Sequence, residues 1–417
     1  MKNLILFVFF PFVLISQESI ENVVKKNNHT INWTTNFIIE SSALNYNFLN
    51  TMLYGGHITD DMKNTWINNG DKNNVIHSEI KNSLSYTYCF NKKSVGFVVA
   101  NIDVLNANFT DDLLRLSFEG NFQHQNTTLN FSNTNIRVSR FQQYKIQYKS
   151  KFKDIQINGG ISYLSGDYHV SYIIEEGYIY TAPFGSYLDV SYDMNAFITD
   201  TSDFSIFANN GNGLAIDFGT DFRIKKYNIN ISLTDLGFII WKPSSIKIST
   251  DSTFNFQGVE IEDIFNFNDS ILESNNLTDD VFRTNNTSFK SYIPATIHFS
   301  ISGKTKYNYF KNYTTGIIAK WQPYMDNEPL SFKKINQGFK ESNFNPLFYI
   351  NSIFNVKSYD LIPSLSYGGY SNDPNIGLEL SKGKIYKLVL GAYHIEDLFS
   401  GEKAKALSLY FNIQLQL

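Results

Sequence analysis

The chain has 417 residues, with 35 Lys and Arg against 39 Asp and Glu, which gives a formal net charge of -4 at pH 7. This balance excludes the general basic surface of a nucleic-acid-binding protein, and a single Cys excludes a disulfide-stapled fold. Aromatic residues make up 16% of the chain, yet after residue 16 no apolar run approaches the roughly 18 residues of a membrane helix, so helical membrane spans are also excluded.

The first sixteen residues have the pattern of an export signal. Lys2 is followed by apolar runs at 4–10 and 12–15, and Ser16 ends the pattern. A short basic start and an apolar stretch too short to span a bilayer predict a secretory signal, 1–16, cleaved near Ser16. The alternative is a buried N-terminal helix.

Residues 17–79 are interpreted as an N-terminal segment that holds a possible plug and the first strand.

Three Thr-Asp-Asp triplets, beginning at Thr59, Thr110 and Thr278, each precede apolar residues. Thr is a good helix N-cap, and acidic residues are favoured in the first turn, so the triplets predict short helices at a mouth or in a plug. The rival interpretation, calcium binding, needs more oxygen ligands than any triplet offers.

Strict alternation of apolar and polar residues dominates 80–417, as at 227–234 and 407–417. Alternation of this period predicts β-strands with one apolar and one polar face. Fourteen strands follow, at 81–90, 94–105, 141–151, 155–164, 186–199, 213–224, 227–236, 291–302, 312–322, 346–356, 359–370, 375–381, 385–394 and 406–417.

Three features favour an antiparallel outer-membrane barrel over a soluble sandwich. The strands are about 9 to 12 residues long, which matches a tilted membrane crossing. The chain stops on a strand at Leu417. Aromatic residues lie near strand ends and predict interfacial girdles, as at Phe141, Tyr144, Trp241, Trp321, Tyr367 and Tyr370.

The connections alternate between short and long. Tight Lys-containing turns occur at 91–93, 152–154, 225–226, 357–358 and 381–384, and longer stretches lie near 106–140, 166–185, 242–290 and 323–345. Short turns at one rim and long loops at the other are typical of a barrel. An even number of strands must then separate two tight turns. Three are predicted between Asp154 and Lys225, so one strand, within 168–180, is missed or misplaced.

Local patterns of catalytic or metal chemistry are absent from the sequence. The seven His residues show no zinc-type spacing, Cys89 has no neighbouring Cys or His, and no nucleophile elbow or phosphate loop occurs. We therefore expect no enzyme activity, no cofactor and no metal. The acidic stretch 260–280 favours a solvated loop, with a cation-attracting mouth as the alternative.

Three strings carry a resemblance to a known family: Asp-Asp-Leu-Leu-Arg-Leu-Ser-Phe-Glu-Gly-Asn at 111–121, Gly-Asn-Gly-Leu-Ala-Ile-Asp-Phe-Gly at 211–219, and Ser-Leu-Thr-Asp-Leu-Gly-Phe-Ile-Ile-Trp at 232–241. Shorter strings at 54–59, 254–259 and 293–295 fit in the same order. The chain resembles an uncharacterised Bacteroidota family of outer-membrane barrels, known only as a domain of unknown function. The resemblance implies a location and an architecture, and fatty-acid-transporter-type barrels are a more distant likeness.

The residues singled out within these strings are Gly120, Asn121, Asp217, Gly219, Asp235, Gly237 and Trp241. Asp235 and Gly237 are interpreted as structural, since a carboxylate after a strand caps backbone N–H groups and Gly permits a bulge or a positive φ. Trp241 is interpreted as an interface anchor. A second hypothesis is that the turn at Asp235 opens a lateral ligand path.

The sequence therefore predicts a transmembrane barrel of about fourteen strands over 80–417 that passes or binds a solute, possibly hydrophobic. A docking component of an envelope complex and a soluble secreted β-sandwich are the alternatives. The expected partners are outer-membrane lipid, the barrel-assembly machinery through the C-terminal strand, and other envelope proteins.

Overall fold

A computed structural model describes residues 28–199, 208–256, 283–305, 310–324, 332–383 and 385–417. The predicted signal 1–16, the triplet at Thr278 and the acidic stretch 260–280 lie outside the described residues.

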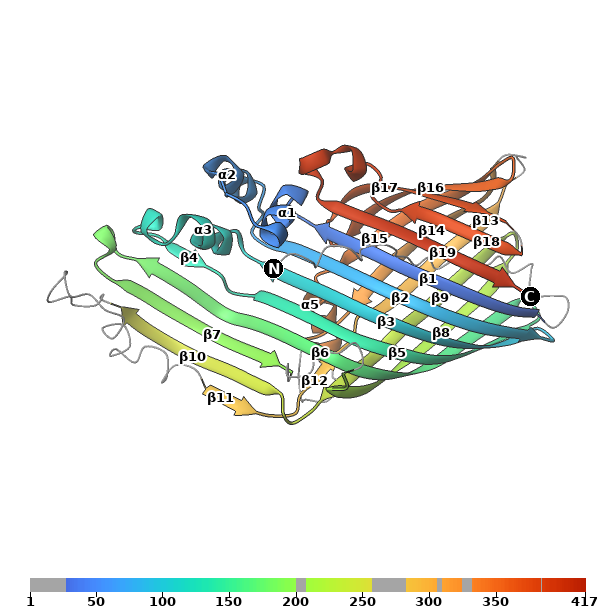
Figure 1. Ribbon diagram of the computed structural model, residues 1–417, viewed down its shortest axis with the longest axis horizontal. Helices are drawn as coiled ribbons and strands as arrows, with labels where there is room; N and C mark the ends of the chain where they lie inside the picture. The colour runs from blue at the N-terminus through green and yellow to red at the C-terminus, as the bar shows by residue number, and fades with distance from the viewer. Residues whose placement is uncertain (1–27, 200–207, 257–282, 306–309, 325–331, 384) are drawn as a thin grey trace.

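Fourteen strands form a closed antiparallel ring, in which the last strand pairs with the first (Figure 1). The predicted fold class is confirmed. The ring consists of β1 (Asn28–Ser41), β2 (Asn74–Phe90), β3 (Lys93–Phe109), β5 (Thr134–Phe152), β6 (Ile155–Thr181), β8 (Gly211–Ile224), β9 (Tyr227–Trp241), β13 (Ala295–Lys304), β14 (Phe310–Trp321), β15 (Asn345–Val356), β16 (Tyr359–Gly369), β17 (Asp373–Lys382), β18 (Tyr386–Ala392) and β19 (Ala406–Gln416).

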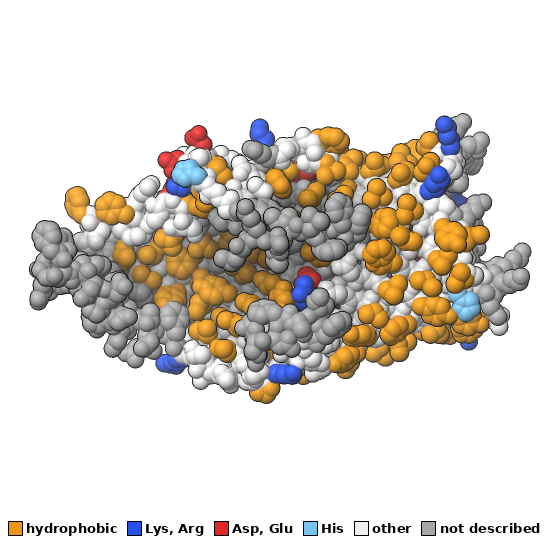
Figure 2. Space-filling view, in the orientation of Figure 1, with side chains coloured by type: hydrophobic (Ala, Val, Ile, Leu, Met, Phe, Trp, Pro, Cys, Tyr) orange, Lys and Arg blue, Asp and Glu red, His pale blue; other side chains and the backbone are white. Residues whose placement is uncertain are grey.

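Apolar side chains point outward from this ring and polar ones point inward. On β6, Ile161 is 66% exposed while its neighbour Ser162 is fully buried. Leu214, Phe348 and Leu365 follow the same outward pattern on other strands. Figure 2 shows hydrophobic side chains spread over the outer surface of the wall. A soluble sandwich would bury these residues in its core, so that alternative is excluded.

One rim of the ring consists of tight turns, as the sequence predicts. Lys92, Lys153, Lys225 and Lys357 have φ values of 65°, 54°, 55° and 58°. A positive φ is what a two-residue hairpin turn of the primed type demands, because its twist matches that of the flanking strands. Figure 1 shows these turns at one end of the barrel and the helices toward the other.

The strand β6 is 27 residues long and pairs with two different strands along one of its sides. Its first part pairs with β8 over Ile155–Gly166, and from Val170 onward the same side of the strand pairs with β7 (Leu188–Ile198). β7 in turn pairs with β10 (Ile246–Phe256), and β10 pairs with β11 (Arg283–Asn286). We call β7, β10, β11 and the part of β6 after Val170 the arm.

The arm explains the odd strand count of the sequence prediction. The predicted strand at 186–199 corresponds to β7 and is not part of the ring, and the segment at 168–180 continues β6. Two ring strands, β6 and β8, therefore separate the tight turns at Lys153 and Lys225. The total of fourteen still holds, because β1 in the 17–79 segment completes the ring.

Short helices cover the long-loop rim. Thr59 caps α2 (Asp60–Asn68) and Thr110 caps α3 (Asp111–Glu119), so both predicted helix starts are confirmed. Trp66 of α2 packs with Leu114 of α3 and with Leu44 next to α1 (Tyr46–Tyr54). Besides β1, the 17–79 segment thus contributes two helices that pack at the rim. No helix among the described residues is long and apolar enough to cross a membrane.

The remaining elements are also short. They are β4 (Thr128–Asn130), β12 (Lys290–Tyr292), α5 (Phe332–Glu341) and the 3-10 turns Phe122–His124, Pro183–Gly185, Asp397–Phe399 and Gly401–Lys403.

Most of the aromatic residues expected in interfacial girdles are buried. Tyr367 is 53% exposed on the outside, but Phe141, Trp241, Trp321 and Tyr370 are 5% exposed or less. Phe141 and Trp241 belong to a cluster with Phe289 and Ile293 of the chain that returns toward β13. The prediction that Trp241 anchors the interface is therefore wrong. Its position in the alternation of the strand points the indole side chain to the inside of the wall.

Candidate functional site

Inward-facing side chains meet inside the barrel in two groups of ion pairs. In the first, the Lys145 bridge, the ammonium group of Lys145 on β5 lies 2.5 Å from Asp217 on β8 and 2.8 Å from Asp235 on β9. Gln143 donates a 2.6 Å hydrogen bond to Asp235, and Lys81 on β2 approaches it to 3.7 Å. Paired charges of this kind compensate for the water that each group loses on burial.

A bulge places Asp235 in this bridge. The pairing of β8 with β9 shifts register between Ile216 and Phe218, and Asp235 has a φ of 59°. Its backbone N–H donates a 2.8 Å hydrogen bond to the Asp217 carboxylate. Two of the residues predicted from the strings are therefore in contact, and both turn their carboxylates toward Lys145.

The glycines of the strings have a different role from the one predicted. The positive φ falls on Asp235 itself, whereas Gly237 leaves room for Ala215 and the β8 backbone, which a Cβ atom would meet. Gly219 leaves room for Asn158 in the same way. Both positions thus permit close strand packing.

The other predicted residues lie away from the bridge. Gly120 ends α3 with a φ of 73°, and the Asn121 side chain donates a 3.4 Å hydrogen bond to the Thr181 hydroxyl at the rim. The Trp241 indole N–H donates to the Ser291 hydroxyl at 2.7 Å inside the wall. The bulge at Asp235 is tied to Lys145, and the hypothesis that this turn opens a lateral ligand path stays a prediction.

The second group, the Lys320 bridge, spans the whole ring. Lys320 on β14 lies 3.6 Å from Glu79 on β2. Six strands separate β14 from β2 in either direction around the ring, so the two strands are opposite one another. The Tyr370 ring completes the group, with the Lys320 ammonium 5.0 Å from its centre and His77 stacked on it at 3.7 Å.

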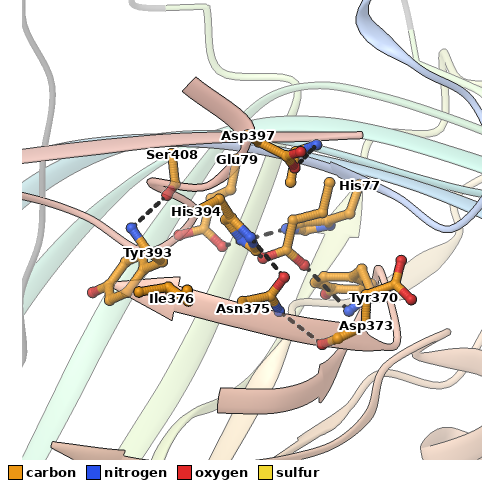
Figure 3. Close-up of polar contacts among 12 residues, drawn as sticks. His77, Glu79, Tyr370, Asp373, Asn375, Ile376, Tyr393, His394, Asp397 and Ser408 are labelled. Carbon is orange, nitrogen blue, oxygen red and sulfur yellow. Dashed lines mark hydrogen bonds and ion pairs between the residues drawn. The ribbon is translucent and has the colours of Figure 1, made fainter. Parts of the chain in front are cut away.

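His394, in the loop between β18 and β19, joins this group to the rim (Figure 3). Its Nε2 lies 2.9 Å from Glu40 on β1, and its Nδ1 lies 3.0 Å from the Asn375 side-chain oxygen and 3.8 Å from Glu396. Burial lowers the pKa of His394, but the carboxylates of Glu396 and Glu40 beside the ring outweigh burial and raise the pKa to about 9. The imidazole is therefore protonated at neutral pH and donates through both nitrogens.

The helix α5 crosses the mouth of the lumen at the long-loop rim. It begins near β14, where the Trp321 indole N–H donates to the Ile335 carbonyl at 2.9 Å. At its other end, Arg137 on β5 donates to the Glu341 carbonyl at 2.5 Å, and Asn106 on β3 donates to the Ser342 carbonyl at 3.1 Å. The described part of the long stretch predicted at 323–345, from residue 332 onward, thus folds across the barrel opening.

His394, Glu396 and Asp397 are the one group of possible metal ligands among the described residues, with ligand atoms within 4.8 Å of one another. Both nitrogens of His394 already face oxygen acceptors, and a protonated imidazole has no lone pair for a metal. This arrangement fits an ion-paired histidine rather than a metal centre.

A hydrogen bond of 2.7 Å joins Ser139 to His169, two residue types that a hydrolase uses. Both are buried, and the His169 ring packs against Trp241 and Phe289. The other ring nitrogen of His169 has no hydrogen-bond partner among the described residues, so no acid in that part of the chain orients the ring.

The sequence places Lys145 on the polar face of its strand but does not show what it meets. Its partner Asp235 is 90 residues away, and Glu40 is 354 residues from His394. The one local signal is the presence of charged residues on faces otherwise lined by small polar residues. Which of these charges meet depends on the order of the strands around the ring, and the sequence prediction misplaces one strand in that order.

The chain is similar to known proteins at the level of family and of architecture. No curated protein matches the sequence. Three similar solved structures are a deletion mutant of the monoaromatic hydrocarbon channel TodX, the toluene transporter TbuX of Ralstonia pickettii, and the translocator domain of the autotransporter NalP from Neisseria meningitidis. Each is 6% identical to this chain and covers 94% of it, with TM-scores of 0.44, 0.41 and 0.34 and with 90%, 89% and 90% of the other chain covered.

The profile of a family of unknown function, DUF5723, matches residues 27–343. The matched range includes the strings at 111–121, 211–219 and 232–241, which carry the resemblance seen in the sequence, and it includes both partners of Lys145. The chain belongs to the DUF5723 family.

Proposed function

We propose that this protein is an exported outer-membrane barrel that passes a small polar solute and that the Lys320 bridge closes the lumen in the resting state. The observation that carries the proposal is the ion pair between Lys320 and Glu79 on opposite sides of a ring whose outer face is apolar. An apolar outer face suits lipid, and a closed ring leaves no unpaired strand edge in it.

The lumen lining favours a polar solute over the hydrophobic one considered from the sequence. Inward positions carry side chains such as Thr34, Asn36, Gln143 and His298, and charged groups project between them. A ring of this size needs a plug or passes solutes. Side chains and α5 supply the obstruction here. The buried Ser139–His169 pair supports a role without catalysis.

Bilayer permeability tests this proposal. The purified protein in liposomes is expected to show little swelling in a small sugar, while Glu79→Gln and Lys320→Met each raise the swelling rate. Lys93→Gln, which removes a charge from an exposed residue at the tight-turn rim, is the matched control and leaves the rate unchanged. Folded bridge variants that stay as impermeable as the wild type contradict the proposal.

Location needs its own measurement. We propose that lipid covers the outer face and that the barrel-assembly machinery recognises β19. Heat-modifiable migration in detergent gels, together with fractionation into the outer membrane, is the expected result. Recovery of a folded protein from the aqueous fraction contradicts the location.

Docking is the second candidate function, and the arm favours it. β7, β10 and β11 extend the sheet without taking part in ring closure, so the arm offers surface that the barrel itself does not need. Cross-linking in gentle detergent tests for envelope partners that depend on the arm. The control replaces β7 (188–198) and β10 (246–256) each by a short linker and keeps the ring strands β8 and β9 that lie between them in the chain.

A further inference from the structure

A cavity of about 300 Å³ opens at the long-loop rim, between the β16–β17 turn and the loop that joins β18 to β19. Residues 371–375 line one side of it, and residues of the 396–406 segment line the other. Its volume is at the lower end of the range for small-molecule sites. The cavity lies next to His394 but outside the Lys145 and Lys320 bridges.

The lining carries charges of both signs. Asp373, Glu396 and Asp397 supply carboxylates, and Lys403 and Lys405 supply ammonium groups. One oxygen of Asp397 accepts the Ala406 N–H at 2.8 Å. Lys405 donates to the Ser42 carbonyl at 3.0 Å and lies 3.7 Å from Asp373. Lys403 is exposed and forms no ion pair with any residue that the structure describes.

Ser371 supplies an independent sign of a ligand. It is only 5% exposed and lines the cavity, yet its hydroxyl has no hydrogen-bond partner in the part of the chain that the structure describes. A buried polar group without a partner is unfavourable by roughly 1–3 kcal/mol, and native proteins leave few of them. A polar ligand in the cavity would satisfy this hydroxyl.

We propose that this cavity binds a small zwitterion, a molecule that carries one ammonium and one carboxylate group, such as a short peptide. The ammonium group faces Glu396 and Asp397, the carboxylate faces Lys403, and a polar group between them bonds the Ser371 hydroxyl. A divalent cation fits less well, because two lysines and the protonated His394 stand beside the carboxylates. The site does not depend on the proposed passage of solutes.

Titration calorimetry of the full chain in detergent micelles tests the proposal, with diglycine as the probe. N-acetyldiglycine lacks the ammonium group and diglycinamide lacks the carboxylate. Diglycine is expected to bind, and each analogue is expected to bind at least about tenfold more weakly, since a hydrogen bond to a charged group is worth about a factor of ten or more. Calcium chloride alone is the fourth titrant.

Variants locate the site. Lys403→Gln and Ser371→Ala are each expected to weaken diglycine binding about tenfold, because each removes a polar partner of the ligand. Lys63→Gln on α2, at the same rim but outside the cavity, leaves binding unchanged. Heat-modifiable migration establishes that every variant is folded.

Three results would overturn the proposal. In the first, diglycine gives no heat of binding with the folded wild type. In the second, diglycine and its two analogues bind with equal affinity. In the third, calcium chloride binds and diglycine does not. Because the assay measures binding in micelles, its failure is distinct from a failure of the permeability test.

Discussion

Raising the pH through the pKa of His394 should destabilise the barrel by a predictable amount. Burial alone would lower this pKa, whereas the ion pairs with Glu396 and Glu40 raise it from 6.5 to about 9. Each pKa unit corresponds to about 1.4 kcal/mol, so protonation of His394 favours the folded state by about 3 kcal/mol. Because the folded-state pKa is the higher one, this stability is fully present below pH 6.5 and is lost as the pH rises through 9.

Urea unfolding in detergent micelles measures the effect, since the free energy of unfolding extrapolates linearly to water. His394→Gln should lower the free energy of unfolding by about 3 kcal/mol at pH 6 and by much less at pH 9.5. The difference between wild type and variant removes the contribution of every other titrating group. A difference that is the same at both pH values would refute the assigned ion pairs.

Three further predictions concern the wall and its interior. Ile231→Lys puts a charge on the lipid-facing side, which is unfavourable by roughly 2–4 kcal/mol, and should block assembly. Asn230→Lys should be tolerated, because Asn230 faces inward and lies 2.8 Å from Asp221. Equal yields of heat-modifiable protein for the two variants would contradict the assigned faces. Lys145→Met removes the nearest cation of both Asp217 and Asp235, leaving Asp235 with Lys81 at 3.7 Å, and should lower the urea unfolding free energy by about 3–5 kcal/mol; a change under about 1 kcal/mol would count against the bridge. Gly166→Val puts a Cβ atom 2.5 Å from the Trp241 ring and should lower the free energy of unfolding in urea by about 1–3 kcal/mol. An unchanged midpoint of urea unfolding would mean that the Trp241 ring lies elsewhere.

The wall could be predicted from the sequence because its signal is local. Alternation of the kind seen at 227–234 fixes a strand and its two faces without any knowledge of its neighbours. Tight turns at Lys153 and Lys225 likewise identify themselves through short Lys-containing connections, and the Thr caps of α2 and α3 precede acidic first turns.

The interior could not be predicted in the same way. Lys320 and Glu79 meet because β14 and β2 are opposite one another, and this depends on how many strands close the ring. Alternation alone places β7 in the wall and leaves β1 unresolved, so the predicted ring order is offset. Trp241 shows the same limit: an aromatic residue at a strand end reads as an interface anchor until the chain at Phe289 is seen to cover it from inside.

The two roles of β6 have a consequence for how this architecture can change over evolutionary time. Among the described residues, β7 and β10 pair with β6, with β11 and with each other, so no hydrogen bond between two ring strands involves them. A lineage can therefore lengthen, shorten or exchange β7 and β10 while the barrel keeps its strand number and diameter. Homologues with the same wall and unrelated outer sheets are the natural outcome of such a division.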